Sequence, residues 1–158
     1  MRAGDFAVVH AKTGQVVRVT VAEVALPQDA DEGVVAYESR LPGGARIEFD
    51  YLPEVGTVSV QGLLTPPDQR RQGEMLTLVR WLVAQPEVKT VVRGVRSELG
   101  AAFSSRFTRE ILAAGKRNLD EFDPEDFPWA DEDTAVVAVC AAEDLPVEFA
   151  VHRRGMAV

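Results

Sequence analysis

Apolar and polar side chains alternate with a period of two over the first 64 residues, which is the pattern of β-strands with one buried face. In the clearest example, Ile47, Phe49 and Tyr51 share one side of a predicted strand. Gly62 lies inside another, where it predicts a bulge or a close backbone approach. We expect strands over residues 6–10, 15–24, 34–41, 45–52 and 57–64.

The apolar spacing changes after Pro66-Pro67. Residues 68–85 carry apolar side chains three or four positions apart, which predicts an amphipathic helix. A β-branched run over 88–95 predicts the next strand. A second helical pattern opens at Ser97 and stops at Gly115, since glycine readily takes the left-handed conformation that ends helices.

The last third of the chain begins with an acidic stretch and ends with two β patterns. We expect residues 118–133 to be a loop because two prolines interrupt them. Residues 134–141 and 147–152 are predicted to form a closing hairpin. The complete order is several antiparallel strands followed by β-α-β-α-β-β. It predicts one domain over 1–158 of the α/β (α+β) class, with helices flanking a mixed, mostly antiparallel sheet.

Composition narrows the classes of function. The chain has 46% hydrophobic residues, enough for one core, and no apolar run near the roughly 20 residues that span a bilayer. A single cysteine, Cys140, rules out an internal disulfide, and we expect a cytoplasmic protein without a membrane partner. His10 and His152 have no other ligand at metal-binding spacing, so no metal site is expected.

The net charge of −8 comes from one segment. Residues 118–133 lack Lys and Arg, and the remainder of the chain is neutral. Dense basic patches drive binding to nucleic acid, so no nucleic-acid partner is expected. The segment predicts a solvated loop, or a lip that attracts cationic ligands. Its carboxylates are Asp120, Glu121, Asp123, Glu125, Asp126, Asp131, Glu132 and Asp133.

The most specific motif lies where the fifth predicted strand meets the first predicted helix. It reads Leu63-Leu64-Thr65-Pro66-Pro67-Asp68-Gln69-Arg70-Arg71-Gln72-Gly73-Glu74-Met75. A helix start presents unpaired backbone N–H groups and partial positive charge, which together favour a phosphate. Gly73 is expected to let a phosphate approach the backbone, and Arg70 and Arg71 to supply countercharge.

This junction resembles the signature of the GNAT N-acyltransferases, in which a strand runs through a proline-containing turn into Arg/Gln-x-x-Gly-x-Gly/Ala. Arg70, Gly73 and Met75 occupy those positions. Members of that family carry a bulge in the strand before the junction, and Gly62 stands at a suitable place. The strand and helix order from residue 57 onward is also similar. The resemblance implies that acetyl-CoA or another acyl-CoA binds between splayed central strands and that its acyl group passes directly to an amine.

The resemblance also implies where the cofactor binds and how this chain departs from the family. Met75 replaces a small residue, and Ser105 stands where the family often has a tyrosine that protonates the leaving thiolate. Serine is a weaker acid than a phenol. Two helices wall the acceptor site in the family, and residues 22–33 of this chain are too short to form both. We therefore expect the acceptor side of this chain to differ from that of the family, or to be completed by a second subunit. The implied cofactor contacts are Leu63, Leu64, Thr65, Arg70, Arg71, Gln72, Gly73, Glu74 and Met75.

A base is needed because an amine substrate arrives as an ammonium ion and must lose a proton before it attacks. Glu48, Asp50 and Glu54 are the candidates, and we select Glu48, with Ser105 positioning a water molecule. Alternatively, Glu48 and Asp50 are only the solvent face of a strand. The expected acceptor is a small-molecule or peptide amine, and it would be cationic if it contacts the acidic segment. We also expect that the protein can form a homodimer.

Two alternative functions remain consistent with the sequence. In the first, the chain is a GNAT-like binding or regulatory module without catalysis, which Met75 and Ser105 favour. In the second, it is an unrelated α+β interaction protein whose acidic segment docks on a basic partner. Binding of coenzyme A would distinguish the acyltransferase from the unrelated interaction protein. Catalytic turnover would distinguish it from the inactive GNAT-like module.

Overall fold

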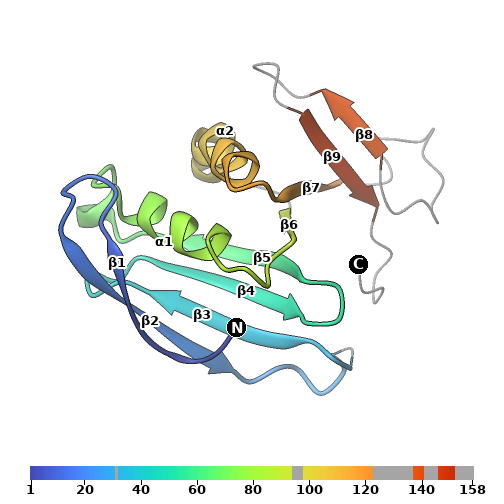
Figure 1. The fold of residues 1–158 in the computed structure, drawn as a ribbon, viewed down its shortest axis with the longest axis horizontal. Helices are drawn as coiled ribbons and strands as arrows, with labels where there is room; N and C mark the ends of the chain where they lie inside the picture. Colours follow the sequence, from blue (N-terminus) through green and yellow to red (C-terminus); the bar gives the residue numbers. More distant parts are fainter. Residues whose placement is uncertain (31, 94–97, 123–136, 141–145, 152–158) are drawn as a thin grey trace.

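Nine strands and two α-helices make up the part of the chain that the computed structural model describes, which is residues 1–30, 32–93, 98–122, 137–140 and 146–151 (Figure 1). The strands are β1 (Gly4–Val9), β2 (Val16–Val24), β3 (Val35–Arg40), β4 (Arg46–Leu52), β5 (Thr57–Leu64), β6 (Thr90–Arg93), β7 (Arg117–Phe122), β8 (Val137–Cys140) and β9 (Pro146–Val151). The helices are a 3₁₀ turn, η1 (Pro67–Gln69), and the α-helices α1 (Glu74–Val83) and α2 (Glu98–Ala113).

These strands form one sheet in the order β1-β2-β3-β4-β5-β6-β7-β9-β8. The first five are an antiparallel meander, whereas β5, β6, β7 and β9 run parallel, and β8 pairs antiparallel to β9. Parallel neighbours need a crossover, which α1 supplies between β5 and β6 and α2 between β6 and β7. The predicted α+β class and the mostly antiparallel sheet are confirmed.

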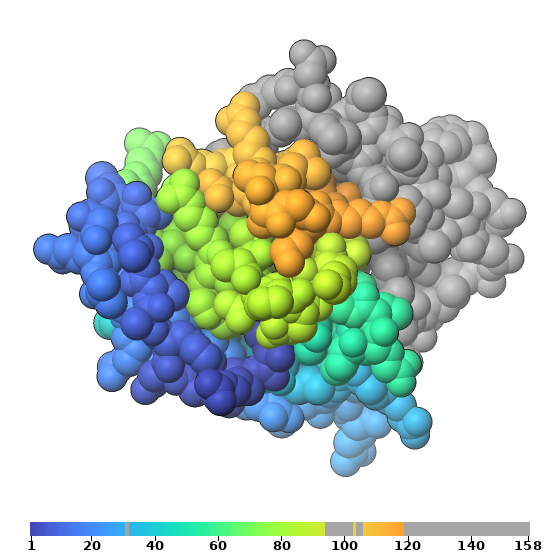
Figure 2. All heavy atoms as spheres, viewed as in Figure 1, coloured from blue at the N-terminus to red at the C-terminus, as the bar shows by residue number. Residues whose placement is uncertain are grey.

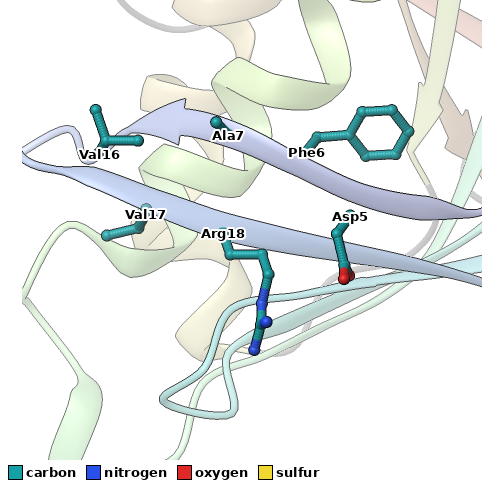
Figure 3. A pocket seen from close by; sticks show the side chains of 6 residues that line it. All are labelled: Asp5, Phe6, Ala7, Val16, Val17 and Arg18. Carbon is teal, nitrogen blue, oxygen red and sulfur yellow. The ribbon is translucent and has the colours of Figure 1, made fainter.

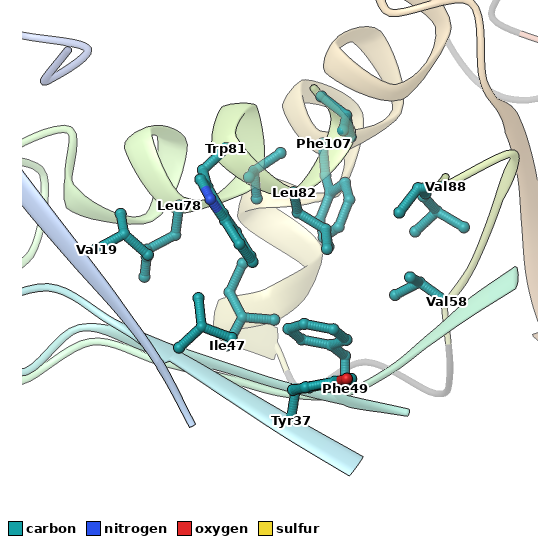
Figure 4. Close-up of a cluster of buried hydrophobic side chains, with 14 of the residues drawn as sticks. Val19, Tyr37, Ile47, Phe49, Val58, Leu78, Trp81, Leu82, Val88 and Phe107 are labelled. Carbon is teal, nitrogen blue, oxygen red and sulfur yellow. The ribbon is translucent and has the colours of Figure 1, made fainter. Parts of the chain in front are cut away.

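Both α-helices pack on the same face of the sheet, where the main hydrophobic core lies (Figures 1 and 4). Trp81 of α1 is central, with ring centroids 6.3 Å from both Phe6 and Phe49. The predicted apolar side of β4 is confirmed, because its side chains are buried in this core. The core includes Val19, Tyr37, Ile47, Phe49, Tyr51, Val58, Leu78, Trp81, Leu82, Phe107 and Ile111.

Helix α1 begins at Glu74, six residues after the start of the helical range 68–85 that the sequence predicts. Residues 67–69 form the separate turn η1. Arg71 and Gly73 then have φ angles of 62° and 78°, which lie in the left-handed region and interrupt a right-handed helix. Residues 68–73 therefore precede α1, and the basic segment among them is a loop.

Strand β7 corrects the predicted loop over residues 118–133. Arg117–Phe122 pairs in parallel with β6, with Asn118 opposite Val91 and Leu119 opposite Val92. Sheet pairing beside a buried strand thus outweighs the polar composition of this segment. Asp120 and Glu121 lie on β7, and the rest of the acidic segment is outside the described residues.

Two valines on β2 test the position of the core. Val19 is fully buried, whereas Val16 is 71% exposed. Val19→Ala should lower the free energy of unfolding by about 2 kcal/mol, because it deletes two buried methyl groups and leaves a cavity. Val16→Ala should change it by less than about 0.5 kcal/mol. Urea denaturation measures both, and equal losses would contradict this assignment of the buried face.

Candidate functional site

Strand β5 loses its regular pairing with β4 at Gln61. Val60 pairs with Phe49 and Gly62 pairs with Glu48, so Gln61 is an extra residue with no partner on β4. Such a bulge bends a strand and increases its local twist. The sequence predicts a bulge at Gly62, and the structure confirms it at the neighbouring residue Gln61.

The bulge follows the described part of the parallel pairing between β5 and β6. The pairs run from Thr57 opposite Thr90 to Val60 opposite Arg93, which is the last described residue of β6. Residues 61–64 of β5 continue past that residue towards α1. The bulge therefore comes directly after the last described pair, on the strand that leads to the helix.

The chain leaves β5 and reaches α1 at Gly73, which is the N-cap residue of the helix. No side chain caps this helix end, so its first N–H groups lack a side-chain acceptor. The turn between β3 and β4 packs against the same loop. A Cβ atom at Gly43 would lie 2.8 Å from Gln69 Oε1, and one at Gly44 would lie 3.1 Å from Pro66 Cγ.

The turn between β1 and β2 is bound to the start of α1 on another side (Figure 2). The Ala11 N–H donates to Thr77 Oγ1 at 2.9 Å, and the Thr77 hydroxyl donates to the Gly73 carbonyl at 2.7 Å. Thr77 is buried within the first turn of α1. One hydroxyl therefore joins the hairpin to the helix over 66 positions of sequence.

His10 makes the second connection between this turn and α1. Its Nδ1 accepts the N–H groups of Lys12 and Thr13 at 3.1 and 3.2 Å, and its Nε2 lies 3.4 Å from Glu74 Oε2. The two accepted bonds require an unprotonated Nδ1, which leaves the proton on Nε2, facing the carboxylate. His10 is 7% exposed. This histidine therefore has a structural role, because it joins the turn to the helix start.

Gly73 is closely packed by this turn. A Cβ atom there would lie 2.9 Å from Lys12 Cβ and 3.4 Å from His10 Cε1. The sequence assigns this small residue to a phosphate, but protein atoms already occupy the space on its Cβ side. Gly73 is therefore required for packing of the β1–β2 turn, and a phosphate would have to approach the helix start from another direction.

Three cationic side chains surround the start of α1. Lys12 Nζ donates to the Arg71 carbonyl at 3.3 Å. Arg70 and Arg71 are exposed, and neither has a carboxylate partner in the part of the chain that the structure describes. Met75 is half-buried and packs against the core, so it does not crowd this surface. The local charge suits an anion.

The carboxylates of β4 project from the sheet face opposite the helices, because they alternate with the buried Phe49. Glu48 lies across from Gly62, and its Oε1 is 3.3 Å from Arg46 Nε. Its Oε2 would be 3.4 Å from a Cβ atom at Gly62, so this carboxylate lies directly beside the bulge. The structure thus brings the predicted base together with the predicted cofactor strand.

Asp50 is the second carboxylate of this face, and Ser59 lies opposite it on β5. Burial raises the pKa of the Asp50 carboxyl above its ordinary value, because the charged form is less well solvated. The Gln61 amide donates to Ser59 Oγ at 3.0 Å. Glu54, the third candidate, is exposed in the turn before β5, at the end opposite to the junction.

Some sequence-based candidates cannot be placed. Ser105 belongs to α2, but its side chain is outside the described residues, so its role stays a prediction. The same holds for His152 and for residues 123–133.

Sequence reasoning missed a buried arginine at the end of β6. Arg93 is 4% exposed, and its guanidinium donates to Asn118 Oδ1 at 3.0 Å and to Thr108 Oγ1 at 2.5 Å. It also lies over the Phe107 ring, 5.2 Å from the centroid. The signal in the sequence that could have revealed Arg93 was a charged residue at the end of an apolar run. This cluster joins β6, α2 and β7 at the end of the described part of β6.

An open depression on the β1–β2 hairpin is a separate feature (Figure 3). Phe6, Val16 and Val17 supply most of its apolar lining, and Asp5 and Arg18 its charges. It contains none of the residues singled out by the junction motif. We therefore place the candidate site at the β5–α1 junction and on the adjoining face of β4.

Comparisons with protein-family models, curated proteins and solved structures find no match to this chain. Within the described ranges, no helix has the length and apolar character needed to cross a membrane. In the same ranges, no three His, Cys, Asp or Glu side chains are grouped as metal ligands. The case for a function rests on the geometry of the junction.

Two glycines with similar φ angles test the packing at the helix start. Gly73 has φ 78° and faces Lys12, whereas Gly115 has φ 74° and no atom within 4 Å of its Cβ position. Gly115→Ala should cost about 1 kcal/mol of stability, from left-handed strain alone. Gly73→Ala should cost about 1–3 kcal/mol more, because the β1–β2 turn must shift. Similar losses in urea denaturation would show that this turn is not packed on Gly73.

Proposed function

We propose that this protein is an acyl-CoA-dependent N-acyltransferase that transfers an acetyl group to an amine. One observation carries the proposal: the bulge at Gln61 interrupts the strand that leads directly into an uncapped, basic helix start. This combination offers backbone for an extended ligand and positive charge for its phosphates.

The cofactor would lie along β5 with its phosphates near α1. Its pantetheine arm would pair with the edge of β5 over Leu63–Thr65, and its pyrophosphate would meet the N–H groups of the first turn of α1. Arg70 and Arg71 would pair with the phosphates, since both are exposed and have no carboxylate partner in the described part of the chain. Gln72, Glu74 and Met75 complete the nine cofactor contacts that the resemblance implies.

The chemistry requires no covalent intermediate on the enzyme. Strand N–H groups near Leu63 would polarise the thioester carbonyl, and the bound amine would attack it directly. A carboxylate on the open face of β4 would take the proton of the ammonium substrate. Ser105 replaces a phenolic acid at the position that the resemblance implies, which favours slow departure of the thiolate, or loss of catalysis with binding retained.

Coenzyme A and acetyl-CoA should raise the melting temperature of the protein. A ligand at 100 times its dissociation constant adds about 2.7 kcal/mol of stability, or roughly 5–10 °C for a domain of this size. Differential scanning fluorimetry provides the measurement, with ATP as a control for any polyanion. No shift at millimolar coenzyme A, or an equal shift with ATP, would contradict a coenzyme A site.

The two arginines of the loop before α1 should contribute to phosphate binding. Arg70→Gln combined with Arg71→Gln should weaken coenzyme A binding about 10- to 100-fold, because two charge-assisted contacts are lost. Pantetheine lacks the pyrophosphate, so its affinity should not change. Arg18→Gln on β2 is the matched control and should leave both affinities unaltered. Calorimetric titration would place the phosphates elsewhere if the double variant bound coenzyme A normally.

A further inference from the structure

The two carboxylates on the open face of β4 differ in their surroundings. Glu48 is already in contact with a cation, since its Oε1 lies 3.3 Å from Arg46 Nε, and its side chain is 43% exposed. The Glu48 carboxylate is therefore already engaged by a cation and by solvent.

Asp50 has no such partner. Across β3 it faces Ala36 and across β5 it faces Ser59, and neither of these side chains titrates in the physiological range. Within the described residues, no hydrogen bond or ion pair reaches its carboxylate, and it is half-buried. A half-buried carboxylate without a cation gains more from accepting a proton than an exposed, paired one does.

Both carboxylates lie near the bulge, Glu48 opposite Gly62 and Asp50 opposite Ser59. Ser59 lies two residues before the extra residue Gln61, and the Gln61 amide bonds to the Ser59 hydroxyl. Asp50 is thus next to the stretch of β5 that turns away from regular pairing. An amine that approaches the edge of β5 over the open face would pass this carboxylate.

We propose that Asp50, in place of Glu48, is the catalytic base that takes a proton from the amine substrate. This assignment rests on the proposed acyltransferase function. The ammonium group gives one proton to the Asp50 carboxylate, and the free amine attacks the thioester carbon. The new C–N bond forms as the C–S bond breaks. The thiolate takes the second proton of the attacking nitrogen, and Asp50 returns its own to water, so atoms and charge balance.

The pH dependence follows from the groups around Asp50. On β3 and β4, the other charged side chains of the open face are Glu38, Arg40, Arg46 and Glu48, and the side chain facing Asp50 from β5 is the uncharged Ser59. Burial raises the pKa of Asp50, so the base is lost through protonation at a higher pH than for an ordinary aspartate. Activity should fall as pH falls through that value.

The test compares single variants by steady-state release of thiol from acetyl-CoA, with spermidine and free lysine as acceptors. Asp50→Asn should lower turnover by about 10²-fold or more near neutral pH, with coenzyme A affinity unchanged. The loss should shrink as pH approaches the pKa of the amine, because a free amine needs no base. Glu48→Gln should lose less than about tenfold, and Glu38→Gln on the same face should stay within about twofold of wild type.

Melting curves show whether Asp50→Asn folds, and Asp50→Ser serves as a second variant if it does not. Turnover of either folded variant within about threefold of wild type, or a loss independent of pH, would overturn the assignment to Asp50 alone. A wild-type protein that binds coenzyme A but acetylates neither amine would overturn the transferase function and, with it, this assignment. A tenfold greater loss in Glu48→Gln than in Asp50→Asn would return the role to Glu48.

Discussion

The packing of α1 on one face of the sheet is the constraint from which the rest of this structure follows. Trp81 lies between Phe6 of β1 and Phe49 of β4, so one indole joins the edge of the meander to its centre. Ile47, Phe49 and Tyr51 of β4 then face the helices, which leaves Arg46, Glu48 and Asp50 on the opposite face. The fold therefore places its carboxylates on a surface that no described helix covers.

The same constraint gives α1 a defined start. The helix can bury its apolar side only if β5 ends near Leu64 and the chain turns back through η1 and a left-handed residue at Gly73. The turns at Gly43–Gly44 and at His10–Thr13 then hold this loop from two sides. The candidate cofactor site is thus a junction held by two turns, and the bulge at Gln61 lies on β5 beside it.

The sequence predicted those parts of the fold that depend on local pattern. Strand β5 has the predicted bounds, because its alternation ends at consecutive prolines, and the buried side of β4 is as expected. The start of α1 was missed because residues 68–73 hold no apolar side chain that could mark the boundary, and the positive φ angles of Arg71 and Gly73 cannot be recognised from local pattern. Strand β7 was missed because its stability comes from pairing with β6, which no local pattern reveals.

The site shows the same division between local and long-range information. The basic segment before α1 could be identified from Arg70 and Arg71 alone. The contact of Lys12 and His10 with Gly73, and the buried position of Arg93, depend on segments far apart in the chain. The choice between Glu48 and Asp50 required the ion pair with Arg46, which alternation along β4 does not predict.

The most direct test of the account is a titration of the isotopically labelled protein with coenzyme A, followed through its backbone amide NMR signals. The account predicts saturable shifts concentrated at Leu63–Thr65 and at Arg70–Met75, with smaller shifts at Lys12. Signals that do not move at millimolar coenzyme A, or shifts confined to the β1–β2 depression or to the acidic segment, would contradict a cofactor site at the β5–α1 junction.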